Sequence, residues 1–256
     1  MRHTIKYFYI SFVLLFLYVP IFVLIIYSFN SAAFSSTWQG FTLDWYRQLL
    51  KNDLLIEAAI NSLTIAFLSS TIASLIGVLA AFSLYRYQFY TKKLIYSLIF
   101  ILIMVPEIVM GISLLFFYSF IKLKLGFFTL LFSHITLCLP FVILVIYARL
   151  LNLEKNLVEA ASDLGANEWQ SFLFVIFPLL MPAFVAGWLL SFTLSMDDVL
   201  ISFFVTGPGF DILPLRIYSM VRLGIKPEVN ALSTFIFIFT LLLVTVAHIF
   251  LRKEKI

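Results

Sequence analysis

Six long apolar runs, separated by short polar stretches, dominate this sequence and restrict the folds open to it. The chain is 63% hydrophobic and 12% charged, whereas soluble domains carry about 25% charged residues. An α-helix needs about 20 apolar residues to cross the hydrocarbon core of a bilayer. The sequence therefore predicts an all-α membrane protein with six transmembrane helices, at residues 7–29, 58–84, 94–121, 127–148, 179–205 and 231–251.

The positive charges predict the orientation of these helices. If the N-terminus is cytoplasmic, ten of the 17 lysines and arginines lie on the cytoplasmic side and seven on the outer side. Cytoplasmic loops carry the excess of positive charge, so both termini are expected in the cytoplasm. Arg2 and Lys6 before the first run would also suit a signal peptide. That run is longer than the roughly 7–15 apolar residues of a signal peptide, which favours a retained helix.

Proline and glycine interrupt the third and fifth predicted helices. Pro106 and Gly111 flank Glu107 in the third, and Pro182 and Gly187 fall early in the fifth. Broken helices at membrane depth are tolerated where protein or a watery cavity satisfies the backbone. Both helices are therefore expected to face a pathway rather than lipid.

Three acids are the only charged residues inside the six runs, namely Glu107, Asp197 and Asp198. A charge at the centre of a membrane helix costs about 2.5 kcal/mol or more, so it usually marks a pathway or a partner. Adjacent helical residues point about 100° apart. We therefore expect one aspartate to face a pathway, while the other pairs with a neighbouring helix or caps a break. A role in helix packing or in contact with a paired subunit remains open for all three.

Two polar side chains are further candidates for a pathway that conducts cations. Ser195 could add a hydroxyl acceptor close to the aspartates, and Trp45 could stack on an ammonium group. Anchoring at the membrane interface is the favoured interpretation of Trp45. His134 stands alone in an apolar run and is expected to be a hydrogen-bonded core histidine rather than a proton relay.

The loop at residues 150–178 is too polar to span a membrane and predicts two short helices. Residues 159–164 suit one helix, with Gly165 at its C-terminal turn. Asn167 can cap a second helix that runs through Phe172. Two short helices separated by a glycine turn would form a rigid projection from the membrane.

This loop resembles the Glu-Ala-Ala motif of ABC-importer permeases. Glu159, Ala160 and Ala161 are followed three residues later by Gly165, and nine further residues lead to a Val-Ile-Phe-Pro sequence that ends at Pro178. Val175 and Phe177 replace the isoleucine and leucine of the family motif. The resemblance implies a type I, MetI-like core whose coupling helices dock on a cytoplasmic ATPase. It also implies that the motif residues and Glu168 take part in coupling to this ATPase. The residues concerned are Glu159, Ala160, Ala161, Gly165, Glu168 and Pro178.

Other stretches resemble the permease subunits of polyamine importers more narrowly. They read WQGFT at 38–42, LYRY at 84–87, FSHIT at 132–136, SFTLSMDD at 191–198, ILPL at 212–215 and PEVNAL at 227–232. This resemblance implies import of spermidine or putrescine across a bacterial inner membrane. It also implies a second homologous permease and a periplasmic polyamine-binding protein as partners, beside membrane lipid. The family core would cover residues 57–248, between an N-terminal segment at 1–56 and a cytoplasmic tail at 249–256.

Two other transport functions remain open. One is an ABC permease for another cationic or small polar solute. The other is a proton-coupled secondary transporter that uses the three membrane acids as a relay, although this function leaves the motif in the loop unexplained. Enzymatic chemistry is not expected, because the sequence has no phosphate-binding loop and offers only three histidines and Cys138. We expect no catalytic residues, no metal, no cofactor and no nucleic-acid partner.

Overall fold

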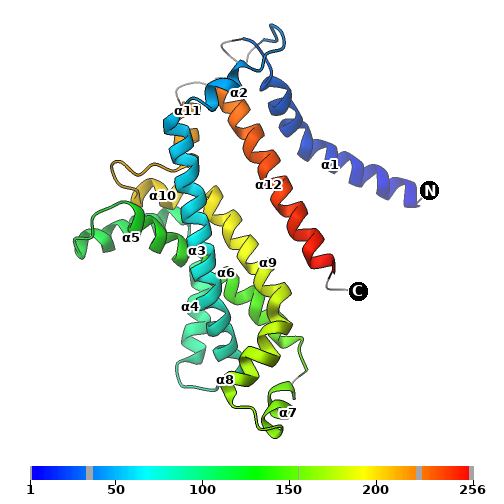
Figure 1. Cartoon of the computed structure of the whole chain (residues 1–256), viewed down its shortest axis with the longest axis vertical. Helices are drawn as coiled ribbons and strands as arrows, with labels where there is room; N and C mark the ends of the chain where they lie inside the picture. The colour runs from blue at the N-terminus through cyan, green and yellow to red at the C-terminus, as the bar shows by residue number, and fades with distance from the viewer. Residues whose placement is uncertain (1, 33–36, 155, 223–226, 254–256) are drawn as a thin grey trace. The chain divides into compact units, whose positions relative to one another are not determined.

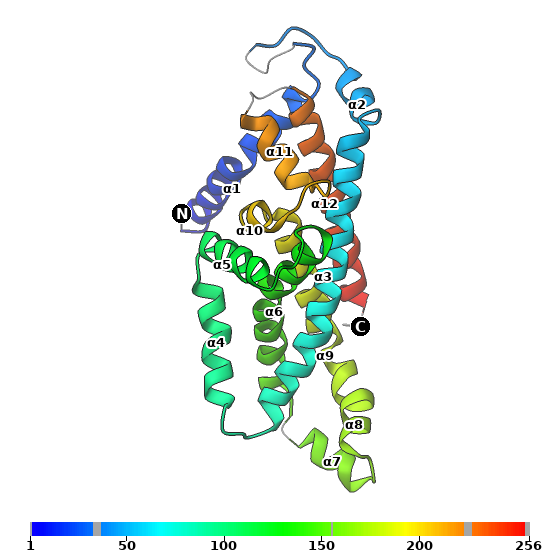
Figure 2. The ribbon, with the colours of Figure 1, turned by 90° about the vertical axis from the view of Figure 1, so that its left-hand side faces the viewer.

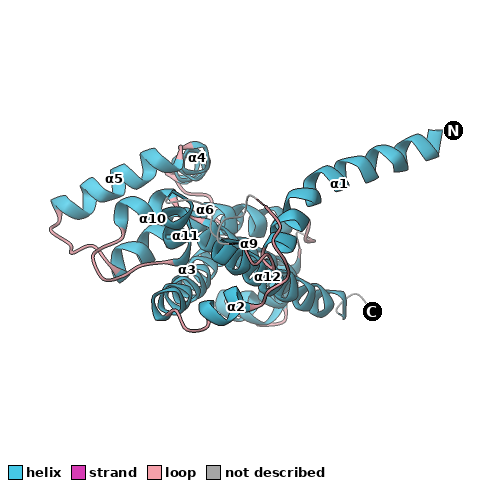
Figure 3. Cartoon of the chain, turned by 90° about the horizontal axis from the view of Figure 1, so that it is seen from above, coloured by secondary structure: helices cyan, strands magenta, loops and turns pink. Residues whose placement is uncertain are grey.

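The computed structural model describes residues 2–32, 37–154, 156–222 and 227–253. Within these residues the chain is helical, apart from loops and one isolated antiparallel bridge between Asn30 and Phe41 (Figure 3). The chain divides into two compact units, one formed by residues 1–57 with 216–256 and the other by residues 58–215. Helix α3 (Asp53–Arg86) and helix α11 (Leu213–Arg222) each cross a boundary between the units.

The first unit contains α1 (Arg2–Tyr27), α2 (Asp44–Leu49) and α12 (Pro227–Lys253). Helix α12 packs against both α2 and α1. The segment before α2 is folded around Asn30, whose Oδ1 accepts the backbone N–H groups of Ala32 at 3.3 Å and Gln39 at 2.9 Å. A buried asparagine with its acceptor satisfied in this way fixes the loop without a sheet.

The second unit contains α3, α4 (Lys92–Met104), α5 (Glu107–Phe120), α6 (Phe127–Leu151), α7 (Leu157–Asp163), α8 (Glu168–Ser171), α9 (Phe177–Asp197) and α10 (Leu200–Val205). Two apolar clusters form its core. One joins α3, α6 and α9 to the α7–α8 loop, and the other joins α3, α5, α6 and α10. As a result, α7 and α8 lie at one end of the unit and α5 and α10 towards the other (Figure 1).

The described helices account for four or five membrane crossings. Four are long and apolar enough to cross alone: Tyr9–Tyr27, Asp53–Arg86, Phe127–Leu151 and Glu168–Asp197. The pair α4 and α5 makes a fifth if it is taken as one broken span, and the two helices are bent by 112° at residues 105 and 106 (Figure 2). Pro106 explains this break, because it cannot continue a helix and forces an extended backbone on Val105. In α12, the stretch Pro227–Leu242 is apolar but shorter than 18 residues.

The predicted interruption early in the fifth span is wrong. Helix α9 runs without a break through Pro182 and Gly187. It ends at Asp197, and α10 begins three residues later at Leu200. The break therefore coincides with the two aspartates. Proline alone does not set the position of a break, because neighbouring helices can satisfy the backbone group that it frees.

Candidate functional site

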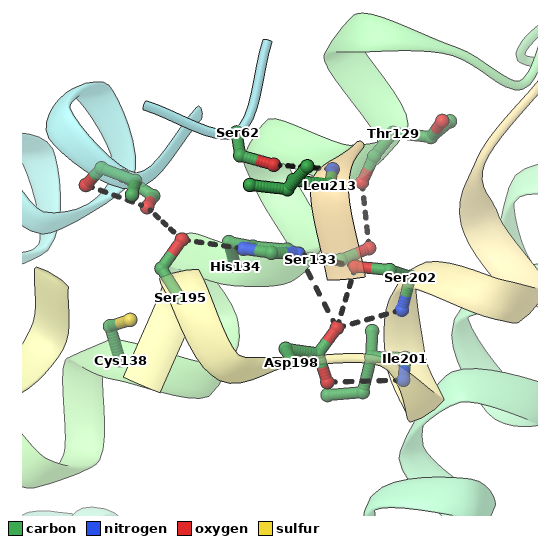
Figure 4. Close-up of polar contacts among 12 residues, drawn as sticks. Ser62, Thr129, Ser133, His134, Cys138, Ser195, Asp198, Ile201, Ser202 and Leu213 are labelled. Carbon is green, nitrogen blue, oxygen red and sulfur yellow. Dashed lines mark hydrogen bonds and ion pairs between the residues drawn. The ribbon is translucent and has the colours of Figure 1, made fainter. Parts of the chain in front are cut away.

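The break between α9 and α10 is built around Asp198. Its backbone is extended, and its side chain turns back over the first turn of α10. Oδ1 accepts the N–H of Ile201 at 3.2 Å, and Oδ2 accepts the N–H of Ser202 at 2.8 Å and its hydroxyl at 2.6 Å (Figure 4). The first N–H groups of a helix have no partner within it, and a carboxylate satisfies them well. Asp198, which is 5% exposed, thus fixes where α10 starts.

His134 of α6 connects this cap to the neighbouring helices. Its ring is fully buried, with Nδ1 at 2.6 Å from the Ser195 hydroxyl and Nε2 at 2.9 Å from the Ser202 hydroxyl. Nε2 also lies 3.5 Å from Asp198 Oδ2. Ser69 of α3 donates to the Ser195 hydroxyl at 3.1 Å. We call Ser69, His134, Ser195, Asp198 and Ser202 the buried network. It ties together α3, α6, α9 and α10.

The other two membrane acids are exposed on the protein surface. Asp197 is the last residue of α9, and Glu107 is the first residue of α5. Glu107 lies within electrostatic reach of both aspartates. Gly111, one turn after Glu107, permits this closeness, because a Cβ there would be 3.2 Å from Ile201 Cα and 2.9 Å from Phe204 Cδ2. The α5 backbone thus lies against α10, and two exposed carboxylates are presented beside the break.

The α7–α8 loop has the architecture that its sequence predicts. Helix α7 ends in a Schellman motif, in which the N–H of Ala166 donates to the Ala161 carbonyl at 3.0 Å and the N–H of Gly165 to the Ser162 carbonyl at 2.9 Å. Gly165 has a φ of +87°, which favours glycine. Asn167 and Gln170 form a reciprocal cap on α8, with bonds of 2.8 and 2.9 Å.

The second predicted helix is continuous with the helix that follows it. Helix α8 continues through the π-helical turn η1 (Phe172–Ile176) directly into α9, so one helical segment leads from the loop to Asp197. Pro178 lies inside this continuous segment, directly after η1, where it has no N–H to donate to the preceding turn. Such π-helical turns frequently mark functional positions. The α7–α8 loop is therefore joined to the break at Asp197 by one continuous helical segment.

Glu168, at the start of α8, already has a partner within its own chain. The Tyr87 hydroxyl donates to Glu168 Oε2 at 2.8 Å, and both residues are exposed. This hydrogen bond, with the negative charge of the carboxylate, raises the pKa of Tyr87 above its ordinary value. The contact links the loop after α3 to α8.

Comparison with known proteins decides the family. The model for the inner membrane component of binding-protein-dependent transport systems matches residues 73–253. The chain belongs to this family. It is therefore a multi-pass inner-membrane permease of the ABC-importer type, and its helical architecture agrees with the MetI-like fold that the sequence predicts.

Its curated relatives include polyamine permeases. The permease is 52% identical to the spermidine/putrescine transport system permease protein PotC of Escherichia coli K12, over 93% of this chain and 90% of the relative. The corresponding protein of Haemophilus influenzae is 46% identical, over 94% and 93%. The putrescine transport system permease protein PotI of E. coli is 40% identical, over 86% and 81%.

Solved structures at low identity share the fold. A bacterial ABC transporter that imports the acidic polysaccharide alginate has a chain that matches with a TM-score of 0.75 at 19% identity, covering 98% of this permease and 95% of that chain. The MetNI methionine transporter in an inward-facing conformation matches with a TM-score of 0.66 at 18% identity, covering 78% and 95%.

The structure separates the predicted pathway residues of the permease. It leaves Glu107 and Asp197 exposed and within electrostatic reach of each other, and it uses Asp198 and Ser195 inside the buried network. Asp198 thus takes the capping position that the sequence left open for one aspartate. Trp45 lies in the other unit, where its indole N–H donates to the Asn30 carbonyl at 2.8 Å.

The predicted coupling residues also differ in accessibility. Glu159, Ala160, Gly165, Glu168 and Pro178 are exposed, but Ala161 is buried against its own chain. The small side chain of Ala161 therefore packs within the α7–α8 loop.

Sequence reasoning missed Ser69 and Ser202 and treated His134 only as a core residue. The spacing of Asp198 and Ser202, four residues apart at the start of a helix, carried a capping signal. The part played by Ser69 had no local signal, because its partner Ser195 is 126 positions away in the sequence.

Proposed function

We propose that this permease translocates polyamines such as spermidine and putrescine across the inner membrane. The observation that carries the proposal is a pair of exposed carboxylates, Asp197 at the break between α9 and α10 and Glu107 within electrostatic reach of it. No lysine or arginine lies in the predicted spans to neutralise them. A substrate with several ammonium groups supplies that neutralisation, and apolar walls suit its methylene chain. The names of the relatives support the same substrate class.

Asp198, Ser195 and Trp45 take part in this pathway in different ways. Asp198 and Ser195 act by holding the break, since the buried network uses their polar atoms. Trp45 offers an aromatic face near the outer end of the chain's first span. The exposed acids are the groups proposed to meet the ammonium groups directly.

The proposal includes a separate ATPase as the source of energy. Residues 159–178 dock on it, with Glu159, Ala160, Gly165 and Glu168 presented towards the partner and Ala161 and Pro178 shaping the loop. Motion then passes through α8 and η1 into α9. A second homologous permease completes the pathway, and a periplasmic polyamine-binding protein delivers substrate to the outer face.

The proposed topology has six membrane crossings with both termini in the cytoplasm. It takes the bent pair α4–α5 as one crossing and α12 as the sixth. The division into residues 1–56, 57–248 and 249–256 belongs to the same proposal. A membrane-impermeant thiol reagent applied to intact cells tests this topology. A cysteine placed near residue 165 should be protected from the reagent, and one placed near residue 209 should be labelled.

Uptake of radiolabelled spermidine and putrescine into vesicles that contain the complete reconstituted system tests the function. We expect uptake to require ATP. The rate of polyamine uptake should fall about ten-fold or more in Asp197→Asn and in Glu107→Gln, because a ten-fold change corresponds to about 1.4 kcal/mol of lost charge interaction. Asp44→Asn, an exposed acid on α2, is the control and should leave uptake unchanged. Absence of polyamine uptake with all partners present would contradict the proposal, and uptake driven by a proton gradient without ATP would favour the secondary-transport alternative.

A further inference from the structure

We infer that His134 is a positioning residue for cation transport, acting through Asp198 to hold the two exposed carboxylates at the break. This inference rests on the proposed function and names a residue that does not itself meet the substrate. His134 is fully buried on α6, so it has no access to a pathway. Its two ring nitrogens instead contact side chains from both sides of the break, Ser195 on α9 and Ser202 on α10.

The hydroxyl protons determine which way the hydrogen bonds of this network run. Ser202 has one hydroxyl proton, and it donates that proton to Asp198 Oδ2 at 2.6 Å. Its oxygen can therefore only accept from His134, so Nε2 must carry a proton. Ser195 accepts from Ser69 and is free to donate its own proton to Nδ1. A proton on Nε2 thus gives both ring nitrogens a hydroxyl partner, while the single Ser69 proton is shared between Ser195 and the Ala66 carbonyl at 3.3 Å.

This assignment makes the network a chain of donors that ends on Asp198. Ser69 donates to Ser195, Ser195 to His134, His134 to Ser202, and Ser202 to the carboxylate. The carboxylate also receives the N–H groups of Ile201 and Ser202. With these donors, few lone pairs of the Asp198 carboxylate remain to bind a substrate cation. The position of the carboxylate is also strongly fixed, because any movement that broke these buried hydrogen bonds would cost free energy.

The position of Asp198 in turn fixes the two exposed acids. Asp197 is its neighbour in the chain at the last residue of α9. Glu107 is placed by α5, whose Gly111 contacts the backbone at Ile201, the residue that Asp198 caps. Removing the imidazole would free the cap, let the start of α10 move, and separate Asp197 from Glu107.

Measurement of both uptake and ATP hydrolysis in the complete reconstituted system tests this inference. His134→Leu removes both hydrogen bonds and keeps an apolar side chain of moderate size. We expect the number of polyamine molecules imported per ATP hydrolysed to fall about ten-fold or more, the factor that corresponds to leaving buried hydrogen-bond partners unsatisfied. Binding-protein-stimulated ATP hydrolysis should persist. His134→Gln, whose amide can both donate and accept, should recover most of the ratio.

A merely structural role would lower uptake and ATP hydrolysis together in proportion to the folded protein, and leave their ratio unchanged. Ser202→Ala removes only the hydroxyl that joins His134 to Asp198, so it gives a second test if His134→Leu does not insert into the membrane. Ser202→Ala should also lower the number of polyamine molecules imported per ATP hydrolysed. Thr136→Val is the matched control, because the Thr136 hydroxyl bonds to the Phe132 carbonyl of its own helix rather than to the network.

The inference also requires that the effects of substitutions at His134 and Asp197 on transport depend on each other. If His134 acts by placing Asp197, the double variant His134→Leu, Asp197→Asn should be no worse than Asp197→Asn alone. Independent, multiplying losses would overturn the inference, as would unchanged ratios in both His134→Leu and Ser202→Ala. Failure of the wild-type system to import polyamine would instead contradict the proposed function.

Discussion

Asp198 and Glu168 are both hydrogen-bonded acids. They lie at opposite ends of the helical segment formed by α8, η1 and α9, with Glu168 at its first residue and Asp198 directly after its last. Asp198 is 5% exposed and receives three hydrogen bonds from Ile201 and Ser202, with the His134 ring close by. Glu168 is exposed and receives a side-chain hydrogen bond from Tyr87. A buried carboxylate with many donors serves the fold, whereas an exposed one with an exchangeable partner stays available to another protein.

The same contrast separates two neighbours in the sequence. Asp197 and Asp198 are identical in side-chain chemistry, yet one is exposed and the other is enclosed. Charge in a membrane helix therefore does not by itself identify a substrate contact. The burial of each acid and the donors around it decide which role is open to it.

The largest effect is expected from removing the buried acid. Asp198→Ala leaves the donors of Ser202 and Ile201 without their acceptor, which should lower the free energy of unfolding by about 3 kcal/mol or more. The apparent melting temperature of the purified permease in detergent measures this. Asp197→Ala is the matched control, expected to stay within about 0.5 kcal/mol of wild type. Equal destabilisation by the two variants would remove the distinction between the aspartates.

The next largest effect tests whether close packing presents the exposed acids. Gly111→Val places side-chain atoms where a Cβ already lies 3.2 Å from Ile201 Cα. We expect about 1–3 kcal/mol of destabilisation, as for other overpacked contacts, together with lower polyamine uptake. Ser113→Ala, exposed on the same helix, should change neither the melting temperature nor uptake. Wild-type stability of Gly111→Val would show that α5 does not need to lie against α10.

In the α7–α8 loop, which is proposed to dock on the ATPase, a change should affect function more than stability. Gly165→Leu meets open space but must adopt a φ of +87°, a strain of about 1–2 kcal/mol for an L-residue. The loop should change shape, and ATP-driven uptake should fall while the melting temperature changes little. Gly165→Asn tolerates this backbone region better and should retain most uptake. Full uptake in Gly165→Leu would mean that the turn is not part of the coupling path.

The smallest effect is expected at the contact between Tyr87 and Glu168. Tyr87→Phe removes one surface hydrogen bond and should change binding-protein-stimulated ATP hydrolysis by no more than about three-fold. Because the pKa of Tyr87 is raised, the phenol stays protonated and the bond is present through neutral pH, being lost only as the pH rises above the ordinary range of tyrosine. A large loss of stability in Tyr87→Phe would mean that this contact stabilises the fold, as the hydrogen bonds of Asp198 do, and would contradict the comparison.

The local features of the α7–α8 loop could be predicted from the sequence because they depend on neighbouring residues. Gly165 ends α7 and Asn167 caps α8, as their residue types and positions indicate. The break in the fifth span could not be placed in this way. Pro182 is accommodated inside α9, and the helix ends where Asp198 finds donors on α10.

The sequence by itself determined that this chain lies in a membrane, that the only charges in its six apolar runs are acidic, and that a polar loop carries the family motif. These conclusions follow from hydrophobicity, charge and short-range spacing, which act along the chain. Only the tertiary structure decided that Asp198 is enclosed while Asp197 and Glu107 are exposed, and that His134 links α6 to both sides of the break. The physical reason is that burial and hydrogen bonding depend on partners brought from distant segments, here 61 and 68 positions away.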